Sequence, residues 1–140
     1  LYSELARVSV TAARAEIQAT GMPATVAAIG GFRQFVLRQK SDSVLAPLSG
    51  FLDFYSMSMC QDLMFHVQEH QMRLPQIASM LAESRLTLLG FANLAPEVMG
   101  AYLRAYPDDL HLTDCANWDA FELQYLHTFG EMYQLWCGTA

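Results

Sequence analysis

The sequence predicts a mainly α-helical chain with one small antiparallel pair of strands. Apolar residues recur at helical spacing through most of its length. Prolines and short polar stretches divide these periodic segments. Two short apolar stretches, 86–91 and 132–137, lack a helical period and suit strands. Because two strands alone are marginally stable, they imply either a hairpin packed on helices or the missing rest of a sheet.

The first half of the chain is predicted to contain three helices and an irregular segment. Ser3 can cap the first helix, and Gly21 can end it in a left-handed conformation. Pro23 suits the first turn of the second helix. Pro47 and Gly50 interrupt the apolar stretch that follows, which is therefore predicted to be irregular. The predicted helices cover about 3–20, 23–40 and 56–65, with residues 44–55 irregular.

The second half alternates helices with the two strands. Pro75 and Pro96 open helices, and Asp114 can cap a third that runs to about Tyr125. The continuous apolar character of 86–91 is typical of a strand covered on both faces. The predicted core contacts are Leu74, Ile77, Ala78 and Leu81 on one helix, Met99, Tyr102, Leu103 and Tyr106 on the next, Trp118 and Phe121 on the last, and Trp136 in the final strand.

Composition excludes several classes of function. Of 140 residues, 53% are hydrophobic and only 16% are charged, which favours a chain with a face that something else covers. The net charge of −6 argues against nucleic acid as the main partner. No apolar run is long enough for a membrane helix. Three scattered cysteines form neither a metal motif nor a disulfide framework, so a reduced, cytoplasmic location is expected.

The densest group of titratable residues is His66-Val-Gln-Glu69-His70. Its spacing matches the H-x-x-E-H pattern of a class of zinc hydrolases. A zinc site needs a helical segment, so that the two histidines share a face, and a third ligand. His111 and His127 are available as ligands, but their spacing does not support them. The other interpretations are a substrate-orienting role and a structural role with hydrogen-bonded imidazoles.

Five segments together resemble one family: Leu1-Tyr-Ser-Glu-Leu-Ala-Arg7, Asp53-Phe-Tyr-Ser-Met-Ser58, Asp62-Leu-Met-Phe-His-Val-Gln-Glu-His70, Leu88-Leu-Gly-Phe91 and Met132-Tyr-Gln-Leu-Trp136. In this order they resemble the C-terminal part of bacterial S-adenosylmethionine-dependent class I methyltransferases, of the kind often joined to tetratricopeptide repeats. The resemblance covers nearly the whole chain. The first residue is Leu1 and not Met, which we interpret as a chain cut from a longer one.

The resemblance implies a place for each part of the chain. Residues 1–65 would form a helical cap, and residues 66–140 the C-terminal helices with the sixth and seventh strands of a Rossmann-like α/β sheet. The glycine-rich turn that holds S-adenosylmethionine would lie before Leu1, so this chain alone is expected to bind no cofactor and no metal. Its partners would be the rest of the methyltransferase domain and tetratricopeptide repeats. The candidate substrate-pocket residues are Tyr2, Arg7, His66, Glu69 and His70.

The chain departs from the family pattern at three positions. Gln61 stands where an Arg is expected, Arg73 where a Thr would cap a helix, and Leu135 where a Phe is expected. The first departure removes a guanidinium partner for Asp62 or Glu69 and puts an ion pair there in doubt. The alternatives to the methyltransferase segment are a free-standing helical interaction module and, more remotely, the zinc hydrolase.

Overall fold

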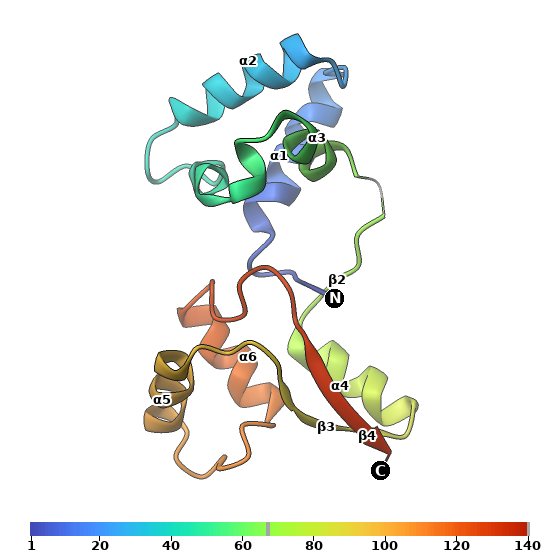
Figure 1. Ribbon diagram of the computed structural model, residues 1–140, viewed down its shortest axis with the longest axis vertical. Helices are drawn as coiled ribbons and strands as arrows, with labels where there is room; N and C mark the ends of the chain where they lie inside the picture. Colours follow the sequence, from blue (N-terminus) through green and yellow to red (C-terminus); the bar gives the residue numbers. More distant parts are fainter. Residues whose placement is uncertain (67, 140) are drawn as a thin grey trace. The chain divides into compact units, whose positions relative to one another are not determined.

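The computed structural model of the chain describes residues 1–66 and 68–139. Over these residues the chain is mainly helical, with one antiparallel and one parallel two-stranded sheet (Figure 1). This confirms the predicted helical class and the antiparallel pair. The chain divides into two compact units. We call Arg7–Glu69 the helical unit, and Leu1–Ala6 together with His70–Ala140 the sheet unit.

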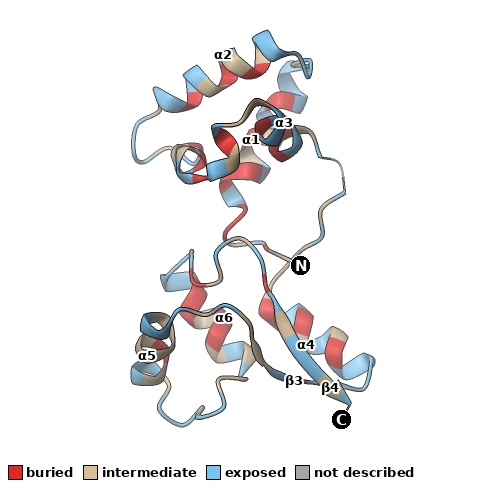
Figure 2. Cartoon of the chain, viewed as in Figure 1, coloured by how far each residue is buried: buried red, intermediate tan, exposed pale blue. Residues whose placement is uncertain are grey.

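The helical unit contains α1 (Val8–Thr20), α2 (Val26–Leu37) and α3 (Met57–Phe65), with the short 3-10 helices η1 (Ala46–Gly50) and η2 (Leu52–Phe54) between α2 and α3. Each α-helix turns its buried residues to one side (Figure 2). These residues form a single apolar core to which η1 and η2 also contribute, built around Val10, Ala13, Ile29, Val36, Leu48, Phe54 and Cys60.

Two predicted helix starts in this unit are wrong, and side-chain hydrogen bonds explain both. The first helix begins at Val8, because Ser3 lies in a short strand and its hydroxyl accepts the N–H of Ala6 within a turn. The second begins at Val26, where the hydroxyl of Thr25 accepts the N–H of Ala28 at 3.3 Å. The predicted end of the first helix is confirmed, since Gly21 caps it with φ of 63°.

The sheet unit contains β1 (Tyr2–Ser3), β2 (Gln71–Met72), α4 (Leu74–Glu83), β3 (Leu86–Phe91), α5 (Pro96–Ala105), α6 (Cys115–Gln124) and β4 (Leu135–Thr139). β3 and β4 pair antiparallel from Leu86 opposite Thr139 to Phe91 opposite Leu135, with an irregularity between Leu88 and Gly90. The second predicted strand therefore begins at Leu135 and not at Met132. The parallel pair β1–β2 was not predicted.

Within the described part of the chain, helices cover only one face of the β3–β4 pair. Leu88, Phe91 and Leu135 pack with α4, α5 and α6 around Trp118, whose ring stacks on Tyr102 with centroids 3.6 Å apart. Trp118 and Phe121 are core residues, as predicted. On the strands, Leu89 is 62% exposed and Trp136 is 66% exposed. The predictions that 86–91 is covered on both faces and that Trp136 is packed are therefore wrong for the residues described.

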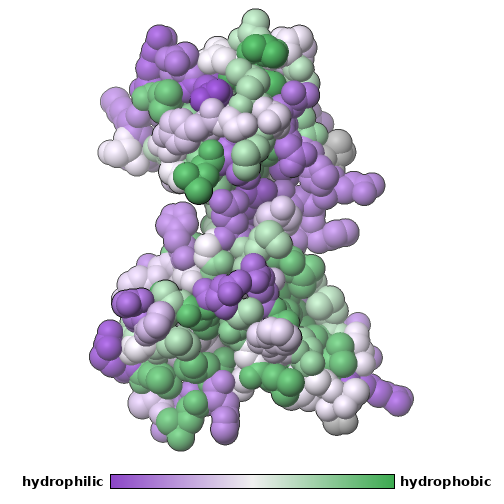
Figure 3. All heavy atoms as spheres, viewed as in Figure 1, coloured by the Kyte–Doolittle hydropathy of each residue, from purple (hydrophilic) through white to green (hydrophobic). Residues whose placement is uncertain are grey.

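The unit's surface carries apolar side chains as a result. Figure 3 shows hydrophobic residues gathered on the viewed face of the sheet unit among scattered polar ones. The exposed large apolar residues of this unit include Leu86, Leu89, Leu110, Leu123 and Trp136. Among the described residues no helix has the length and apolar character that a membrane crossing requires.

Candidate functional site

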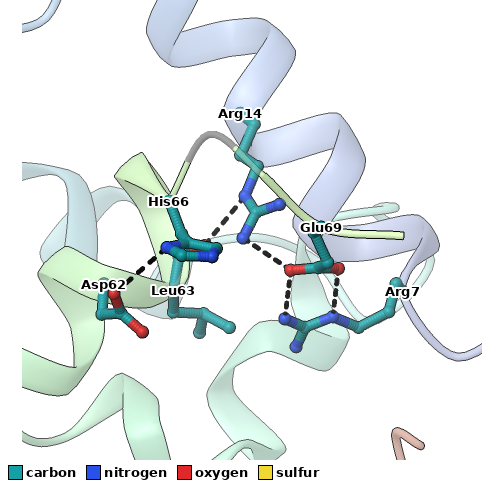
Figure 4. A network of polar contacts seen from close by, with 6 residues as sticks. All are labelled: Arg7, Arg14, Asp62, Leu63, His66 and Glu69. Carbon is teal, nitrogen blue, oxygen red and sulfur yellow. Dashed lines mark hydrogen bonds and ion pairs between the residues drawn. The ribbon is translucent and has the colours of Figure 1, made fainter. Parts of the chain in front are cut away.

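Glu69 is the centre of an ion-pair network in the helical unit (Figure 4). Its carboxylate accepts two hydrogen bonds from Arg7, from Nε at 2.9 Å and from Nη2 at 2.7 Å. Arg14 Nη2 donates to the same carboxylate at 2.8 Å, and Arg14 Nε donates to the carbonyl of Leu63 at 3.0 Å. Arg7 caps α1 and Arg14 lies on it, so the network ties this helix to the segment after α3.

The Arg7–Glu69 pair is buried. The two side chains are 4% and 3% exposed, whereas Arg14 is 21% exposed. Two guanidinium groups surround one carboxylate, so the desolvated negative charge is fully compensated. The arginine partners of Glu69 thus come from the N-cap of α1 and from α1 itself, and not from position 61. The structure brings the candidates Arg7 and Glu69 together and withdraws both from solvent.

The candidate His66 lies beside this network and remains accessible. Its Nδ1 is 3.6 Å from Oδ1 of Asp62, and the two side chains are 50% and 79% exposed. A pocket of about 400 Å³ opens here, lined by Ser58, Gln61, Asp62, Phe65 and His66. A hydroxyl, an amide, a carboxylate and an imidazole thus line one pocket over an aromatic ring. Of the predicted site residues, His66 is the one that belongs to this lining.

The zinc geometry that H-x-x-E-H requires is not met. α3 ends at Phe65, and His66 has extended backbone angles, so His66 and His70 do not follow one another on a helix face. The carboxylate of Glu69 is held by two arginines. Among residues 1–66 and 68–139, no cluster of three histidine, cysteine or acidic side chains could hold a metal ion.

Tyr2 and His70 meet in the sheet unit. The N–H of Tyr2 donates to the carbonyl of His70 at 3.1 Å, and Tyr2 then pairs with Gln71 in the β1–β2 sheet. The His70 residue is exposed, and Tyr2 is half-buried. This hydrogen bond joins backbone atoms, so it positions the two residues without assigning chemistry to their side chains.

A buried carboxylate that the sequence analysis missed is Glu122 on α6. It is fully buried, and it accepts hydrogen bonds from the hydroxyls of Ser3 and Tyr133, each at 2.5 Å. Burial raises the pKa of Glu122, although the two hydroxyl donors act to lower it. The only sequence signal is its position between Phe121 and Leu123, a charge inside an apolar stretch.

Arg73, the second departure from the family pattern, has a structural partner. Its Nε and Nη2 donate to the two carboxylate oxygens of Asp119 at 2.9 Å and 2.6 Å. This hydrogen-bonded carboxylate raises the pKa of Arg73. The main-chain N–H of Arg73 donates to the side chain of Gln76 at 2.7 Å and so helps to cap α4. Arg73 therefore helps to cap the start of α4 and, through its ion pair with Asp119, joins this helix to α6.

Among the described residues the glycines with positive φ are Gly21 after α1, Gly90 within β3 and Gly130 before β4. No protein-family model matches this chain, and no curated protein sequence matches it.

Proposed function

We propose that the chain is the C-terminal segment of a class I methyltransferase that uses S-adenosylmethionine, of the kind joined to tetratricopeptide repeats. Residues 1–65 form its helical cap, and residues 66–140 end its Rossmann-like sheet. The observation that carries the proposal is the β3–β4 pair, antiparallel as the last two strands of such a sheet are, with helices on one face only. The ordered family-like segments described above support it further.

The uncovered face of the pair supports an incomplete sheet. Sheets of α/β proteins are covered by helices on both sides. Here Leu89 and Trp136 are largely exposed, whereas Leu88, Phe91 and Leu135 of the same strands pack into the core. In the complete enzyme, upstream helices and strands would cover them. S-adenosylmethionine would be held by residues before Leu1 and would supply the methyl group that is transferred.

The contribution of this chain to the reaction is to orient the methyl acceptor. The pocket beside His66 is the proposed place, because its imidazole, hydroxyl, amide and carboxylate groups are accessible together. If the methyl-accepting substrate must lose a proton before it reacts, the imidazole of His66 can take up that proton. The buried Arg7–Glu69 pair is a positioning element, since it fixes the segment that follows α3. Tyr2 and His70 stay substrate-pocket candidates of the complete enzyme.

A second candidate is the free-standing helical interaction module. Exposed apolar side chains of the helical unit favour it, notably Leu52, which is 88% exposed, and Val26, which is 68% exposed. Exposed apolar residues that stand singly are normal, however, and these two come from different elements, η2 and α2. If the chain is an interaction module, its partner protein should remain unmodified. If the chain belongs to a methyltransferase, the complete protein should yield a methylated product.

The reading frame upstream of the Leu1 codon tests the proposal. We expect it to encode parallel strands with a glycine-rich turn, and the complete product to transfer radiolabelled methyl groups to its acceptor. In that protein His66→Ala should raise KM for the acceptor or lower kcat, while His111→Ala, an exposed histidine of the sheet unit, should change neither. An upstream frame without such a turn contradicts the proposal and favours the interaction module.

A further inference from the structure

A second pocket lies in the sheet unit, between the first half of α5 and the end of α6. It has a volume of about 400 Å³, and its apolar lining comes from Val98 and Ala101 of α5, Phe121 of α6 and Leu126 of the turn that follows α6. Ligand sites in proteins typically have volumes of about 300–1,000 Å³ and are mostly apolar, with a few polar groups that orient the ligand. The pocket therefore has the size and the lining of a small-molecule site.

The floor of this pocket belongs to the core of the sheet unit. Phe121 is only 4% exposed, and its ring meets that of Trp118 edge to face, with centroids 5.7 Å apart. Val98 and Ala101 pack against the same core from α5. The side chains of the floor are thus held in place without a ligand, which reduces the entropy that binding would cost.

Tyr125, the residue that ends α6, adds an aromatic wall. Its ring lies against that of Phe121, with centroids 4.7 Å apart, yet the residue is 56% exposed. Its N–H donates to the carbonyls of Phe121 and Glu122, each at 3.1 Å. The hydroxyl of Thr128, another lining residue, donates to the carbonyl of Tyr125 at 2.6 Å. These bonds fix the turn after α6, so the ring is positioned at the pocket and remains accessible to a ligand.

Glu97, in the first turn of α5, gives the pocket its charge. Of the described residues that line the pocket, none is a lysine or an arginine, and Glu97 carries the one carboxylate. This side chain is exposed, and nothing within 1–66 and 68–139 forms an ion pair or hydrogen bond with it. A carboxylate in a first turn also stabilises its own helix, so its position alone assigns no ligand. Beside an apolar pocket with the ring of Tyr125, however, it selects for positive charge, because carboxylates and aromatic faces both attract cations.

We propose that this pocket binds a small organic cation with an aromatic body, of the arylalkylamine class. The aromatic body occupies the apolar floor and lies against Tyr125, and the ammonium group lies at the carboxylate of Glu97. The same carboxylate repels an anion, and a neutral ligand leaves it unused. The inference goes beyond the proposed methyltransferase function and does not depend on it, since the pocket lies within the sheet unit and contains none of the substrate-pocket candidates.

A matched set of indoles tests the charge selection: tryptamine as the cation, tryptophol as its neutral analogue and indole-3-propionate as the anion. Titrations of the chain followed by ¹H–¹³C NMR report both affinity and place, because Val98, Ala101 and Leu126 carry methyl groups at the pocket. We expect saturable shifts of these signals and about three- to tenfold tighter binding of tryptamine than of tryptophol, with indole-3-propionate weakest. Equal affinities for tryptamine and tryptophol overturn the proposal, and so does the absence of saturable shifts at these methyl groups.

A carboxylate-to-amide pair identifies the group that selects the charge. Glu97→Gln should lower the affinity for tryptamine to that for tryptophol and leave the affinity for tryptophol unchanged. Glu83→Gln makes the same change at an exposed carboxylate at the end of α4, outside the lining, and should change neither affinity. If Glu97→Gln and Glu83→Gln weaken tryptamine binding equally, the general negative charge of the chain attracts the cation, and the proposal is wrong.

Two further variants test whether the apolar lining holds the indole ring. Ala101→Leu extends a lining side chain into the pocket and should abolish the binding of tryptamine and tryptophol alike, with far-UV circular dichroism confirming that α5 is intact. Leu126→Ala removes a 46% exposed side chain of the turn, outside the core, and should weaken both probes by a similar factor. Tryptamine binding that neither variant weakens lies elsewhere on the chain and overturns the proposal.

Discussion

Replacing Glu69 with Gln tests the most buried ion pair of the helical unit. The substitution keeps the shape of the side chain but removes its charge, so Arg7 loses the buried carboxylate with which it forms an ion pair. Arg7 and Glu69 are 4% and 3% exposed, so solvent cannot compensate either of them. Breaking a buried pair in this way costs about 3–5 kcal/mol. Loss of the Arg14–Glu69 ion pair adds little to this cost. Arg14 is 21% exposed, so water can solvate its guanidinium in place of the carboxylate.

The measurement is urea denaturation followed by far-UV circular dichroism, which reports the helices of both units. Tryptophan fluorescence separates the units, because Trp118 and Trp136 both lie in the sheet unit. A loss of about 3–5 kcal/mol is a large part of the 5–15 kcal/mol that stabilises a typical domain. We therefore expect α1 and α3 to unfold early in Glu69→Gln, with the transition midpoint moved to lower urea concentration.

Asp62→Asn is the matched control, since it makes the same carboxylate-to-amide change on α3. Asp62 is 79% exposed and only 3.6 Å from an exposed imidazole, so the change should stay within about 0.5 kcal/mol. If Glu69→Gln also falls within that range, the carboxylate is not a buried partner of Arg7. Glu69 would then be free to act on a substrate, and its assignment as a positioning residue would be wrong.

Three further predictions concern the sheet unit, the helix caps and the glycines. The pKa of Glu122 in the folded protein is raised above its ordinary value of 4.5. The free energy of unfolding should therefore fall as the pH rises from about 4.5 through this raised pKa. In urea denaturation, Glu122→Gln should show a weaker pH dependence over this range. Asp114→Ala removes the acceptor of two N–H groups at the start of α6 and should cost about 1 kcal/mol in thermal unfolding. Gly21→Ala should destabilise α1 by about 1–2 kcal/mol, because alanine does not favour the φ of 63° at this position. Gly30→Ala should stabilise α2 by up to about 1 kcal/mol, because alanine favours a helix more than glycine does. Neither added methyl group meets an atom within 4 Å, so a clash affects neither variant.

Each of these has a result that contradicts it. The Glu122 prediction fails if wild type and variant share one pH slope above 4.5. The Asp114 prediction fails if Asp114→Asn, which keeps an acceptor oxygen, loses as much stability as Asp114→Ala. The glycine prediction fails if the two alanine variants shift the Tm in the same direction, because backbone conformation is then not what separates them.

Local sequence signals predicted the elements that depend on local chemistry. Asp114 is an N-cap residue before an apolar period, and α6 begins directly after it. Gly21 ends α1 as expected, because only a left-handed residue closes the helix there. The strand at Leu86–Phe91 was predicted from its lack of helical period, and its bounds agree with the structure.

Long-range partners decided the rest. Ser3 looked like a helix cap, yet it bonds to Glu122, a residue 119 positions away that no local pattern connects to it. The partners of Glu69 are 62 and 55 positions away, at the start of α1 and within it, so no local pattern around Gln61 indicates them. Trp136 looked like a packing residue because aromatic residues suit strands, but the described chain supplies nothing to cover that face.

We propose that this chain completes a methyltransferase whose cofactor site lies upstream of Leu1. Calorimetric titration of S-adenosylmethionine into the complete gene product, with residues 1–140 titrated in parallel, is the sharpest test of this proposal. We expect saturable binding of one cofactor per chain by the complete product and no binding by residues 1–140. Absence of binding to the folded complete product would refute the proposal, and so would saturable binding to residues 1–140 alone.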